Sequence, residues 1–472
     1  MIGRLALRSL TAHPVRSAVL AAGFGVGVAV MAILLGVAQV VLEQSRAPAL
    51  VGGGDVLIRL APEVPARLVL AGALQTNALR SQITTAAPTH TTSLYLRHGG
   101  RSTRVAARGG IPSLERMLGD DEIGGIPSWS DSSDDIAWTQ DTPERVLRYI
   151  DRFHAIPDAP TWGASWAEWL YFNGRASGAR FYLTFLVGSA MPDGRRYAGV
   201  RLQLDRGGRI ETFTATQPVT EAAVQRAPDL DIGESFVRLE GMTYRVHLDL
   251  RDSTGRRVRG DLTIAASPGR LVPPLEITGA LGWLSGYVVP VMSGRLDGVL
   301  DIGDERLSFA DGTGYHDHNW GFWQGVSWQW GQVQQGDLSL LYGRVFPPSA
   351  AADPDRVPGF VGVLGPDGPL GYATDVTITE TNDASGAPQI ISVRARGSDL
   401  NIQIRFDVES AVTTRGTGSA SSASAAPGPL GSGLDFLQLR GTYTVTGRAG
   451  GRTLKFAAPG SAETFRGSVR TR

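Results

Sequence analysis

Alternating apolar and polar residues dominate the chain from about Trp162 onward. In the run Tyr244-Arg-Val-His-Leu-Asp-Leu-Arg, every second side chain is apolar. In an extended segment these two sets face opposite sides, so the pattern predicts a half-buried antiparallel strand. Similar runs recur at Phe181–Val187, Tyr197–Leu204, Ile210–Ala215, Arg295–Ile302, Leu338–Val345, Asp375–Glu380, Ile390–Ala395 and Thr442–Gly447. Strands at this density, separated by turn signals, predict all-β sandwiches or barrels.

A continuous apolar run lies near the N-terminus. It carries no charged side chain from Ser17 to Leu42, which is long enough to cross a bilayer as a tilted helix. Arg4, Arg8 and Arg16 precede it without an acid, so the positive-inside rule predicts export of the chain beyond this run. We expect a cytoplasmic tail at residues 1–17 and a single-pass transmembrane helix at 18–42 in the cytoplasmic (inner) membrane, with the bulk of the chain extracytoplasmic. The alternatives are a cleaved signal peptide, whose apolar region is usually shorter, and a buried core helix.

Residues 5–20, the glycine-rich run after them and Gly52-Gly-Gly-Asp-Val resemble the opening of macrolide-exporter-type ABC permease subunits. In that family a short cytoplasmic helix, one span and a periplasmic domain come first, and further spans come after them. This sequence has no other stretch of 18 apolar residues, so the chain cannot itself form a transport channel. The resemblance implies an ABC transporter permease as a partner, and we expect residues 43–155 to form an extracytoplasmic permease-like spacer.

Composition narrows the function classes. The chain has 472 residues, enough for two or three domains, and its 45 Lys+Arg balance 45 Asp+Glu, which argues against nucleic acid as a partner. Cysteine is absent, which excludes disulfides, a thiolate nucleophile and Cys-ligated metal sites. Sequence motifs for phosphate-binding loops, serine hydrolases and zinc proteases are missing. The low-complexity segment 413–433 predicts a flexible insertion between two strands.

The sharpest candidate site is the segment Gly312–Gly321, which reads Gly-Thr-Gly-Tyr-His-Asp-His-Asn-Trp-Gly. If the segment is extended, alternate side chains share a face and form two sets: His316, His318 and Trp320, and Tyr315, Asp317 and Asn319. One face then serves a ligand, and the other holds a supporting hydrogen-bond network. A structural turn whose polar groups satisfy one another is an equal alternative. A metal site needs a third ligand, and the other five histidines have no helpful spacing, so we predict no metal.

Further aromatic residues come soon after this segment. Trp328 and Trp330 share a strand face, and on the next predicted strand Tyr342 and Arg344 project toward the same region. Core packing is the default interpretation of such tryptophans, and a surface position is an equal one for Arg344. The alternative is a pocket for a large apolar ligand, in which Arg344 meets an anionic head group.

A second aromatic cluster occupies Trp162–Gly174. Its simplest interpretation is a barrel-closing first strand, although Trp169 and Tyr171 are also candidates for ligand contact. Of the residues in this cluster, Glu168 is the one that core packing explains least. A carboxylate buried among aromatic rings is expected to have a raised pKa and to act as a proton donor.

Three segments in order resemble the carotenoid 1,2-hydratase / AttH-like family, also called hydroxyneurosporene synthase-like. They are Glu168-Trp-Leu-Tyr-Phe-Asn-Gly with Ala179-Arg-Phe-Tyr-Leu-Thr-Phe, the central segment Gly312–Gly321, and Gly460-Ser-Ala-Glu-Thr-Phe-Arg-Gly. The resemblance implies a mainly β fold of two consecutive lipocalin-like (calycin) barrels that enclose apolar cavities. We place these barrels at residues 156–284 and 285–472. Family enzymes are thought to add water to the 1,2 double bond of acyclic carotenoids by acid-initiated chemistry, without a cofactor.

The resemblance also implies residue roles. His318 and Trp320 match the His-x-Trp pair proposed for the hydratase site, while Tyr342 and Arg344 fall on the family's downstream tyrosine and acid. Because arginine is a poor acid for an alkene, Asp317 or Glu168 would have to substitute. We therefore expect a membrane-anchored protein that binds a hydrophobic lipid or isoprenoid ligand. The alternative is a hydratase that uses the same cavity.

Overall fold

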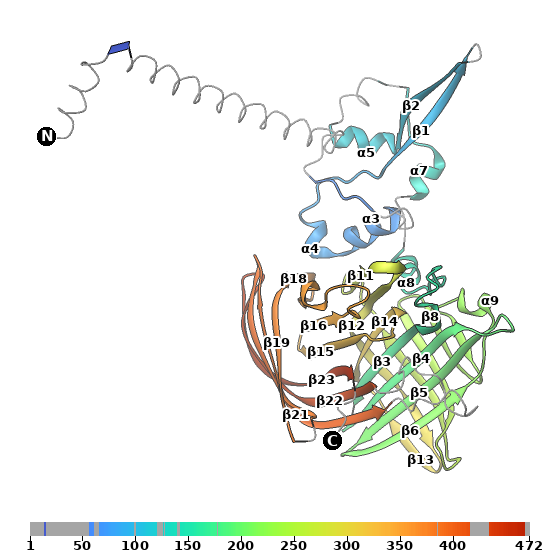
Figure 1. The fold of residues 1–472 in the computed structure, drawn as a ribbon, viewed down its shortest axis with the longest axis vertical. Helices are drawn as coiled ribbons and strands as arrows, with labels where there is room; N and C mark the ends of the chain where they lie inside the picture. Colours follow the sequence, from blue (N-terminus) through green and yellow to red (C-terminus); the bar gives the residue numbers. More distant parts are fainter. Residues whose placement is uncertain are drawn as a thin grey trace. The chain divides into compact units, whose positions relative to one another are not determined.

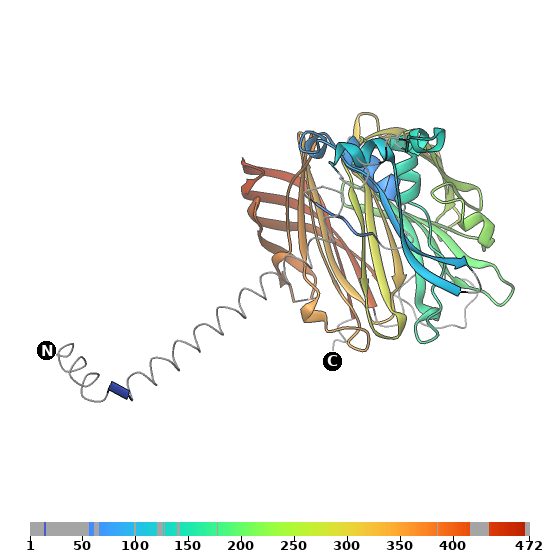
Figure 2. The same ribbon diagram turned by 90° about the horizontal axis from the view of Figure 1, so that it is seen from above.

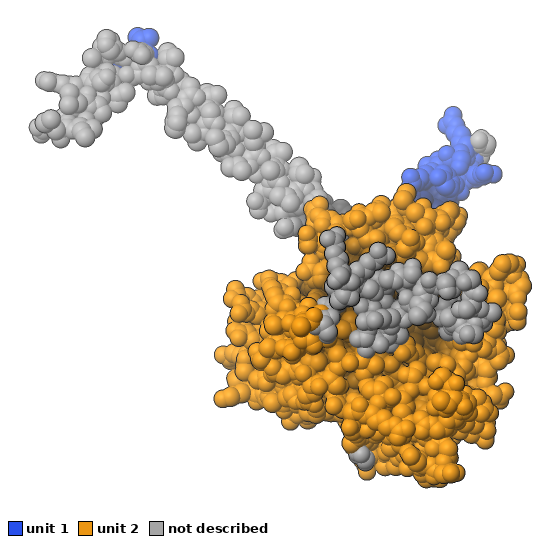
Figure 3. All heavy atoms as spheres, turned by 60° about the horizontal axis from the view of Figure 1, so that its bottom comes forward, with its two compact units in different colours: residues 1–66, 85–138 blue, residues 67–84, 139–472 orange. Residues whose placement is uncertain are grey.

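A computed structural model describes residues 14–15, 56–60, 66–98, 101–119, 126, 128–138, 142–176, 178–384, 386–415 and 434–467. The chain forms two compact units, coloured separately in Figure 3. The first comprises residues 1–66 and 85–138, and the second comprises residues 67–84 and 139–472. The fold is mainly β, as the alternating pattern predicted.

The first unit contains a hairpin of β1 (Thr89–His98) and β2 (Arg101–Gly110), followed by α5 (Pro112–Met117) and α7 (Ser133–Trp138). Glu115 of α5 is 1% exposed. Its carboxylate accepts hydrogen bonds from the Thr89 hydroxyl at 2.8 Å and from Arg108 Nη2 at 2.5 Å. Because a buried carboxylate is costly without such partners, this acid ties the short helix to the hairpin.

Strands make up most of the second unit, and its helices are short. These helices are α3 (Ala66–Gln75, of which all but Ala66 belong to this unit), α4 (Asn77–Arg80), α8 (Pro143–Ile150), α9 (Glu221–Val224), and the 3₁₀ turns η2 (Gly163–Ser165), η3 (Ala280–Gly282) and η4 (Pro354–Arg356). Two antiparallel sheets carry the rest, as Figures 1 and 2 show.

The first sheet has twelve strands among the described residues. They are β3 (Trp166–Ala176), β4 (Ala179–Ala190), β5 (Arg196–Arg206), β6 (Arg209–Thr216), β7 (Leu230–Ile232), β8 (Ser235–Glu240), β9 (Thr243–Arg251), β10 (Arg257–Ala265), β11 (Val272–Thr278), β12 (Leu284–Ile302), β13 (Glu305–Ser308) and β14 (Gly312–Phe322). Eight of them follow the order β10-β12-β14-β3-β4-β5-β6-β9, and β9 pairs with β10 again. The contact of β6 with β9 is a single pair, Thr214 with Arg251, so the ring is a nearly closed barrel.

The second sheet has nine described strands in the order β18-β17-β16-β15-β23-β22-β21-β20-β19. They are β15 (Ser327–Gln335), β16 (Leu338–Phe346), β17 (Phe360–Gly365), β18 (Gly368–Ala373), β19 (Asp375–Asn382), β20 (Pro388–Arg396), β21 (Leu400–Arg415), β22 (Leu434–Ala449) and β23 (Arg452–Gly467). No ladder in the part of the chain that the structure describes joins β18 to β19. This sheet is therefore open, unlike the second closed barrel that the sequence led us to expect.

The strands of residues 284–322 pair within the first sheet. The chain thus changes sheet between Phe322 and Ser327, not at the expected boundary of 284 and 285. The physical reason is that β12 and β14 complete the first ring, pairing with β10 and β3. Alternation along each strand carries no information about which partner strand closes the ring.

All nine runs predicted from alternation lie in strands: β4, β5, β6, β9, β12, β16, β19, β20 and β22. The expected transmembrane segment at 18–42 lies outside the described residues, as does most of the expected insertion at 413–433. Within the described part of the chain, no helix has the length and apolar character required to span a membrane.

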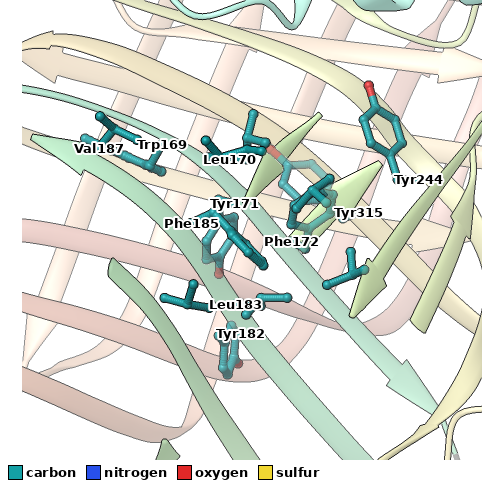
Figure 4. Close-up of a cluster of buried hydrophobic side chains, with 14 of the residues drawn as sticks. Trp169, Leu170, Tyr171, Phe172, Tyr182, Leu183, Phe185, Val187, Tyr244 and Tyr315 are labelled. Carbon is teal, nitrogen blue, oxygen red and sulfur yellow. The ribbon is translucent and has the colours of Figure 1, made fainter. Parts of the chain in front are cut away.

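The neighbouring strands β3 and β14 are buried on both faces. In β3 the nine residues from Trp166 to Gly174 are all buried, because the barrel interior covers one face and the second sheet the other. The interior face carries Leu170 and Phe172, and the ring of Phe172 packs edge-on against Tyr244 of β9; Figure 4 labels all three residues. The opposite face carries Tyr171, whose neighbours include residues of β23. This double burial explains the aromatic density of the segment.

Candidate functional site

Helix α8 positions the first group of the site. Thr142 caps it by accepting a hydrogen bond from the backbone of Arg145 at 3.3 Å, and Pro143 occupies its first turn. Its residues Val146, Leu147 and Ile150 are buried, and Leu147 and Ile150 pack in the core of the barrel. The chain leaves the helix at Asp151, which is 0% exposed. The helix thereby places a carboxylate against the interior face of β14.

Five side chains then form a continuous hydrogen-bonded chain of alternating imidazoles and carboxylates. Its order is His316, Asp151, His318, Glu168 and His154, with distances of 2.9, 3.1, 2.9 and 2.7 Å between successive partners. The first four members are 0% exposed, whereas the His154 side chain is 27% exposed. We call this set the relay.

The inner end of the relay is His316. Its Nδ1 donates to the backbone carbonyl of Tyr171 at 2.9 Å, and its Nε2 lies 2.9 Å from Asp151 Oδ2. Burial alone would raise the pKa of Asp151, but the positive charge of His316 and hydrogen bonds from both histidines lower it to about 2. Both ring nitrogens of His316 thus face oxygen acceptors, one of them on an ionised carboxylate.

His318 bridges the two acids of the relay. Its Nδ1 faces Asp151 and its Nε2 faces Glu168, so both nitrogens donate. Burial lowers the pKa of this ring, but the hydrogen bonds and charges of the two carboxylates raise it to about 9. His318 is therefore an imidazolium at neutral pH, and its positive charge lies between the two buried carboxylates.

Glu168 corrects one expectation of the sequence. It is buried among aromatic residues as predicted, but its pKa is lowered and not raised. Burial pushes the pKa up, and hydrogen bonds from His154 and His318 outweigh it. The backbone N–H of His154 also donates to the carboxylate at 3.0 Å. Glu168 is thus an ionised hydrogen-bond acceptor, not the proton donor that burial alone predicts.

At the outer end of the relay, two aromatic rings stack on each other. His154 stacks on Trp320, whose indole Nε1 donates to the exposed Glu276 of β11 at 2.9 Å. Because His154 Nδ1 donates to Glu168, its Nε2 is the remaining ring nitrogen, and it has no hydrogen-bond partner among the described residues. His154 Nε2 is therefore the relay atom available to a ligand.

The same side chains include the described residues that could hold a metal ion. Ligand atoms of His154, Glu168 and His318 lie within 4.8 Å of one another. The fold thus supplies a third group that the histidine spacing did not reveal. These atoms also satisfy each other by hydrogen bonds, so the cluster is complete as an ionic network.

A second polar cluster lies on the opposite face of β14. Asp317 accepts a hydrogen bond from Asn319 Nδ2 at 2.7 Å, and Tyr315 accepts one from Trp330 Nε1 at 3.0 Å. Burial raises the pKa of Asp317 well above its usual value, and the charge of Glu463 on β23 adds to it. Burial also raises the pKa of Glu463, to about 7. Asp317 therefore faces the second sheet and does not join His318.

The remaining predicted site residues divide between the two sheets. Tyr171 contributes only its carbonyl to the relay, while Trp169 packs on Trp323 and Trp328. Trp330 packs edge-on against Tyr287. The relay contains none of these indoles.

The two residues expected on the following strand also lie away from the relay. Tyr342 belongs to the core of the second sheet and packs near Tyr443. Arg344 lies over Phe346 and donates to the Pro354 carbonyl at 3.2 Å. Of the residues expected at the site, His316, His318 and Glu168 belong to the relay, and Trp320 packs beside it. Tyr342 and Arg344 do not contact it.

Sequence reasoning missed Asp151 and His154. Both lie in the segment assigned to the permease-like spacer, more than 150 residues before His318. The signal that could have found them is the helix start Thr142-Pro143-Glu144, followed by apolar residues at helical spacing. That pattern predicts a helix packed on the barrel, which then delivers the acid at its end.

No family model matches the chain, and no curated protein matches it. Among solved structures, a putative AttH from Nitrosomonas europaea is 13% identical, with 67% of this chain and 98% of that chain covered and a TM-score of 0.41. Kievitone hydratase from Nectria haematococca is 14% identical, with coverages of 67% and 96% and a TM-score of 0.41. CghA is 12% identical, with coverages of 71% and 97% and a TM-score of 0.40.

Proposed function

We propose that the protein is an acid–base enzyme of the hydratase class that adds water to a double bond of a hydrophobic, isoprenoid-type substrate. The observation that carries the proposal is the relay itself, which links the buried imidazolium of His318 to the half-buried His154. The ionised Glu168 accepts a hydrogen bond from His154 Nδ1 and so orients the ring with Nε2 toward a substrate, where it can give and take a proton. The residue-level resemblance of the central segment to carotenoid 1,2-hydratases supports the choice of reaction.

The proposed reaction balances without a cofactor. Protonated His154 gives its Nε2 proton to one alkene carbon, and the adjacent carbon becomes a carbocation. Water adds to this carbon, and the proton that the bound water loses returns to His154 Nε2. The indole of Trp320 lies against His154 and offers a π-face that stabilises positive charge in the substrate.

An assay with an acyclic polyene tests this function. Full-length protein incubated with a lycopene-type substrate should yield a product heavier by one water, detected by liquid chromatography and mass spectrometry. His154→Phe should lower product formation by about a hundredfold or more, because phenylalanine has no acidic N–H proton to donate. His247→Phe is the matched control, since His247 lies on β9 and pairs with Asp261 away from the relay. Equal product from His154→Phe would reject the proposal.

A second candidate is storage or transfer of a hydrophobic ligand without chemistry. The 0% exposure of His316 and His318 favours it, because neither ring can touch a ligand in this conformation. The same incubation separates the candidates. Recovery of the unchanged polyene bound to the protein supports binding, whereas hydrated product supports catalysis.

We also propose that residues 18–42 anchor the protein in the inner membrane, with the barrel outside the cytoplasm and an ABC permease as a partner. The uncharged run and the three preceding arginines support this location. Alkaline carbonate extraction of the expressed chain tests it. The anchored protein stays in the membrane fraction, and release into the soluble fraction contradicts the proposal.

A further inference from the structure

A row of cationic side chains crosses the first sheet. Strand pairing places Arg180 of β4 opposite Arg175 of β3, Arg175 opposite Thr313 of β14, and Thr313 opposite Arg295 of β12. Directly paired residues share one face of a sheet, and neighbouring strands lie roughly 5 Å apart. Three arginines and one threonine therefore stand in one line, on the face opposite the relay.

The pair Arg175 and Arg180 is unfavourable by itself. Like charges directly opposite each other destabilise a strand pair. The pKa of Arg175 is lowered, first by burial and then by the charge of Arg180. Neither residue forms an ion pair with another described residue. Arg175 Nη1 donates to the Pro459 carbonyl at 2.8 Å, and Arg180 Nη1 donates to the Gly460 carbonyl at 2.9 Å.

The acids near this row bind other partners. Asp205 is paired with Arg180 across β4 and β5, but it forms its ion pair with Arg440 at 2.7 Å. Arg295 is held by Asp297 at 2.8 Å and Asp311 at 3.3 Å. Arg295 is therefore largely neutralised, whereas Arg175 keeps an uncompensated charge.

A cleft of about 410 Å³ opens along the row. Its described lining contains three arginines, serine, threonine and glutamine side chains, glycines, and no acid: Arg175, Ser267, Arg270, Ser293, Gly294, Arg295, Gly312, Thr313, Gln334, Gln335 and Gly336. Arg270 donates through Nη2 to the Ser339 hydroxyl at 3.2 Å, and its buried Nε has no hydrogen-bond partner among the described residues. Arg270 Nη2 also donates to the Asp337 backbone carbonyl at 3.2 Å, and the charge of Arg270 lowers the pKa of the Asp337 carboxyl, which is itself paired with Arg452. The cleft thus combines two guanidinium groups that form no ion pair with a described residue and several neutral donors.

We propose that this cleft binds the phosphate group of a phosphorylated ligand, held by Arg175 and Arg270 with Thr313 as a further donor. Guanidinium groups match the oxygens of phosphate with paired hydrogen bonds. The volume also accommodates an organic part beyond the phosphate group. Binding would neutralise the repulsion between Arg175 and Arg180. The site uses no residue of the relay, so it stands independently of the hydratase proposal.

Calorimetric titration of the full-length protein tests the site with three soluble probes: inorganic phosphate, glycerol 3-phosphate and glycerol. We expect saturable binding of the two phosphates, and no binding of glycerol or of chloride at equal ionic strength. Arg175→Gln and Arg270→Gln should each weaken phosphate binding by at least about tenfold, because each removes a charge-assisted contact. Arg306→Gln is the matched control, since Arg306 is 73% exposed on β13, away from the cleft lining, and should bind as wild type does.

Two further measurements distinguish the ligand source and the structural alternative. Binding to phosphatidic acid vesicles that glycerol 3-phosphate displaces indicates a lipid headgroup, whereas binding of soluble phosphates alone indicates a small metabolite; both support a phosphate site. Without anion, Arg175→Gln should melt at the same temperature as wild type or higher, because like-charge repulsion is removed. Wild-type affinity for phosphate in Arg175→Gln, or no phosphate binding by wild type at millimolar concentration, overturns the proposal.

Discussion

The imidazole of His154 stacks on the indole of Trp320, with ring centroids 4.2 Å apart and planes inclined by 20°. This contact fixes the position of His154, the one member of the relay that is not fully buried. Replacing His154 by phenylalanine keeps an aromatic ring on Trp320 but removes both nitrogens. We expect product formation in the polyene assay to fall by about a hundredfold or more, the typical contribution of a positioned proton donor. A melting temperature close to wild type would show that the loss is chemical.

Removal of His318 should destabilise the protein strongly. His318→Ala leaves Asp151 and Glu168 buried without the imidazolium that they share. Breaking a buried ion pair from one side typically costs about 3–5 kcal/mol, which urea unfolding measures. His247→Ala is the control, because its partner Asp261 is 62% exposed and the expected loss is about 1 kcal/mol or less. Equal losses in both variants would contradict the ionic role of His318.

Stability should decline on both sides of neutral pH because of the relay. Folding raises the pKa of His318 from 6.5 to about 9. The contribution of His318 to the stability of the fold is therefore fully present below pH 6.5 and is lost as the pH increases to 9. The pKa of Asp151 falls from 3.8 to about 2, so its stabilisation is present above pH 3.8 and is lost as pH falls toward 2. Melting temperatures across this range test both limits. In His318→Gln the decline above pH 6.5 should be smaller than in wild type.

The raised pKa of Glu463 leads us to expect a second change of protein stability with pH, in the acidic range. Burial raises its pKa from 4.5 to about 7, so folding is favoured most below pH 4.5 and that contribution is lost as pH rises through 7. Glu463→Gln resembles the neutral carboxyl and should stabilise the protein at about pH 8 relative to about pH 5. Differential scanning calorimetry compares the two conditions. Glu240→Gln, at a side chain that is 56% exposed, should leave the pH dependence unchanged.

The close approach of Gly286 to Trp320 gives a packing prediction. A Cβ atom at Gly286 would lie 2.3 Å from Trp320 Cε2, so Gly286→Ala must displace the indole from Glu276 and from His154. Overpacking of this kind costs about 1–3 kcal/mol, and tryptophan fluorescence should report the shifted ring. Gly163→Ala is the control, since no atom lies within 4 Å of its added Cβ. An unchanged spectrum in Gly286→Ala would show that Trp320 is not fixed by this contact.

The extended conformation of individual strands, and which side chains share a face, could be predicted from the sequence. The segment Gly312–Gly321 is extended, and its histidines and Trp320 share one face while Tyr315 and Asp317 share the other. That prediction required only the period of an extended chain, which holds without knowledge of the partners. The burial of Glu168 could be inferred in the same way from the aromatic residues around it.

The partner of each polar group could not be predicted, because the partners come from distant segments. Asp151 and His154 reach β14 only through the packing of α8, and they determine the charge of His318 and the direction of the pKa shift of Glu168. Burial without known donors predicts the opposite shift. The open edge of the second sheet likewise depends on ladder pairing, which alternation does not encode.

The two-faced burial of β14 has a consequence for how this protein can change over evolution. A single-residue insertion or deletion within Gly312–Gly321 would exchange the faces of every later side chain in the strand and turn Asp317 toward the barrel interior in place of the histidines. We therefore expect related sequences to differ in this strand by substitutions only and to keep its length. Length variation should instead concentrate in solvent-facing hairpin turns such as Asp193-Gly194, where an extra residue shifts no paired face.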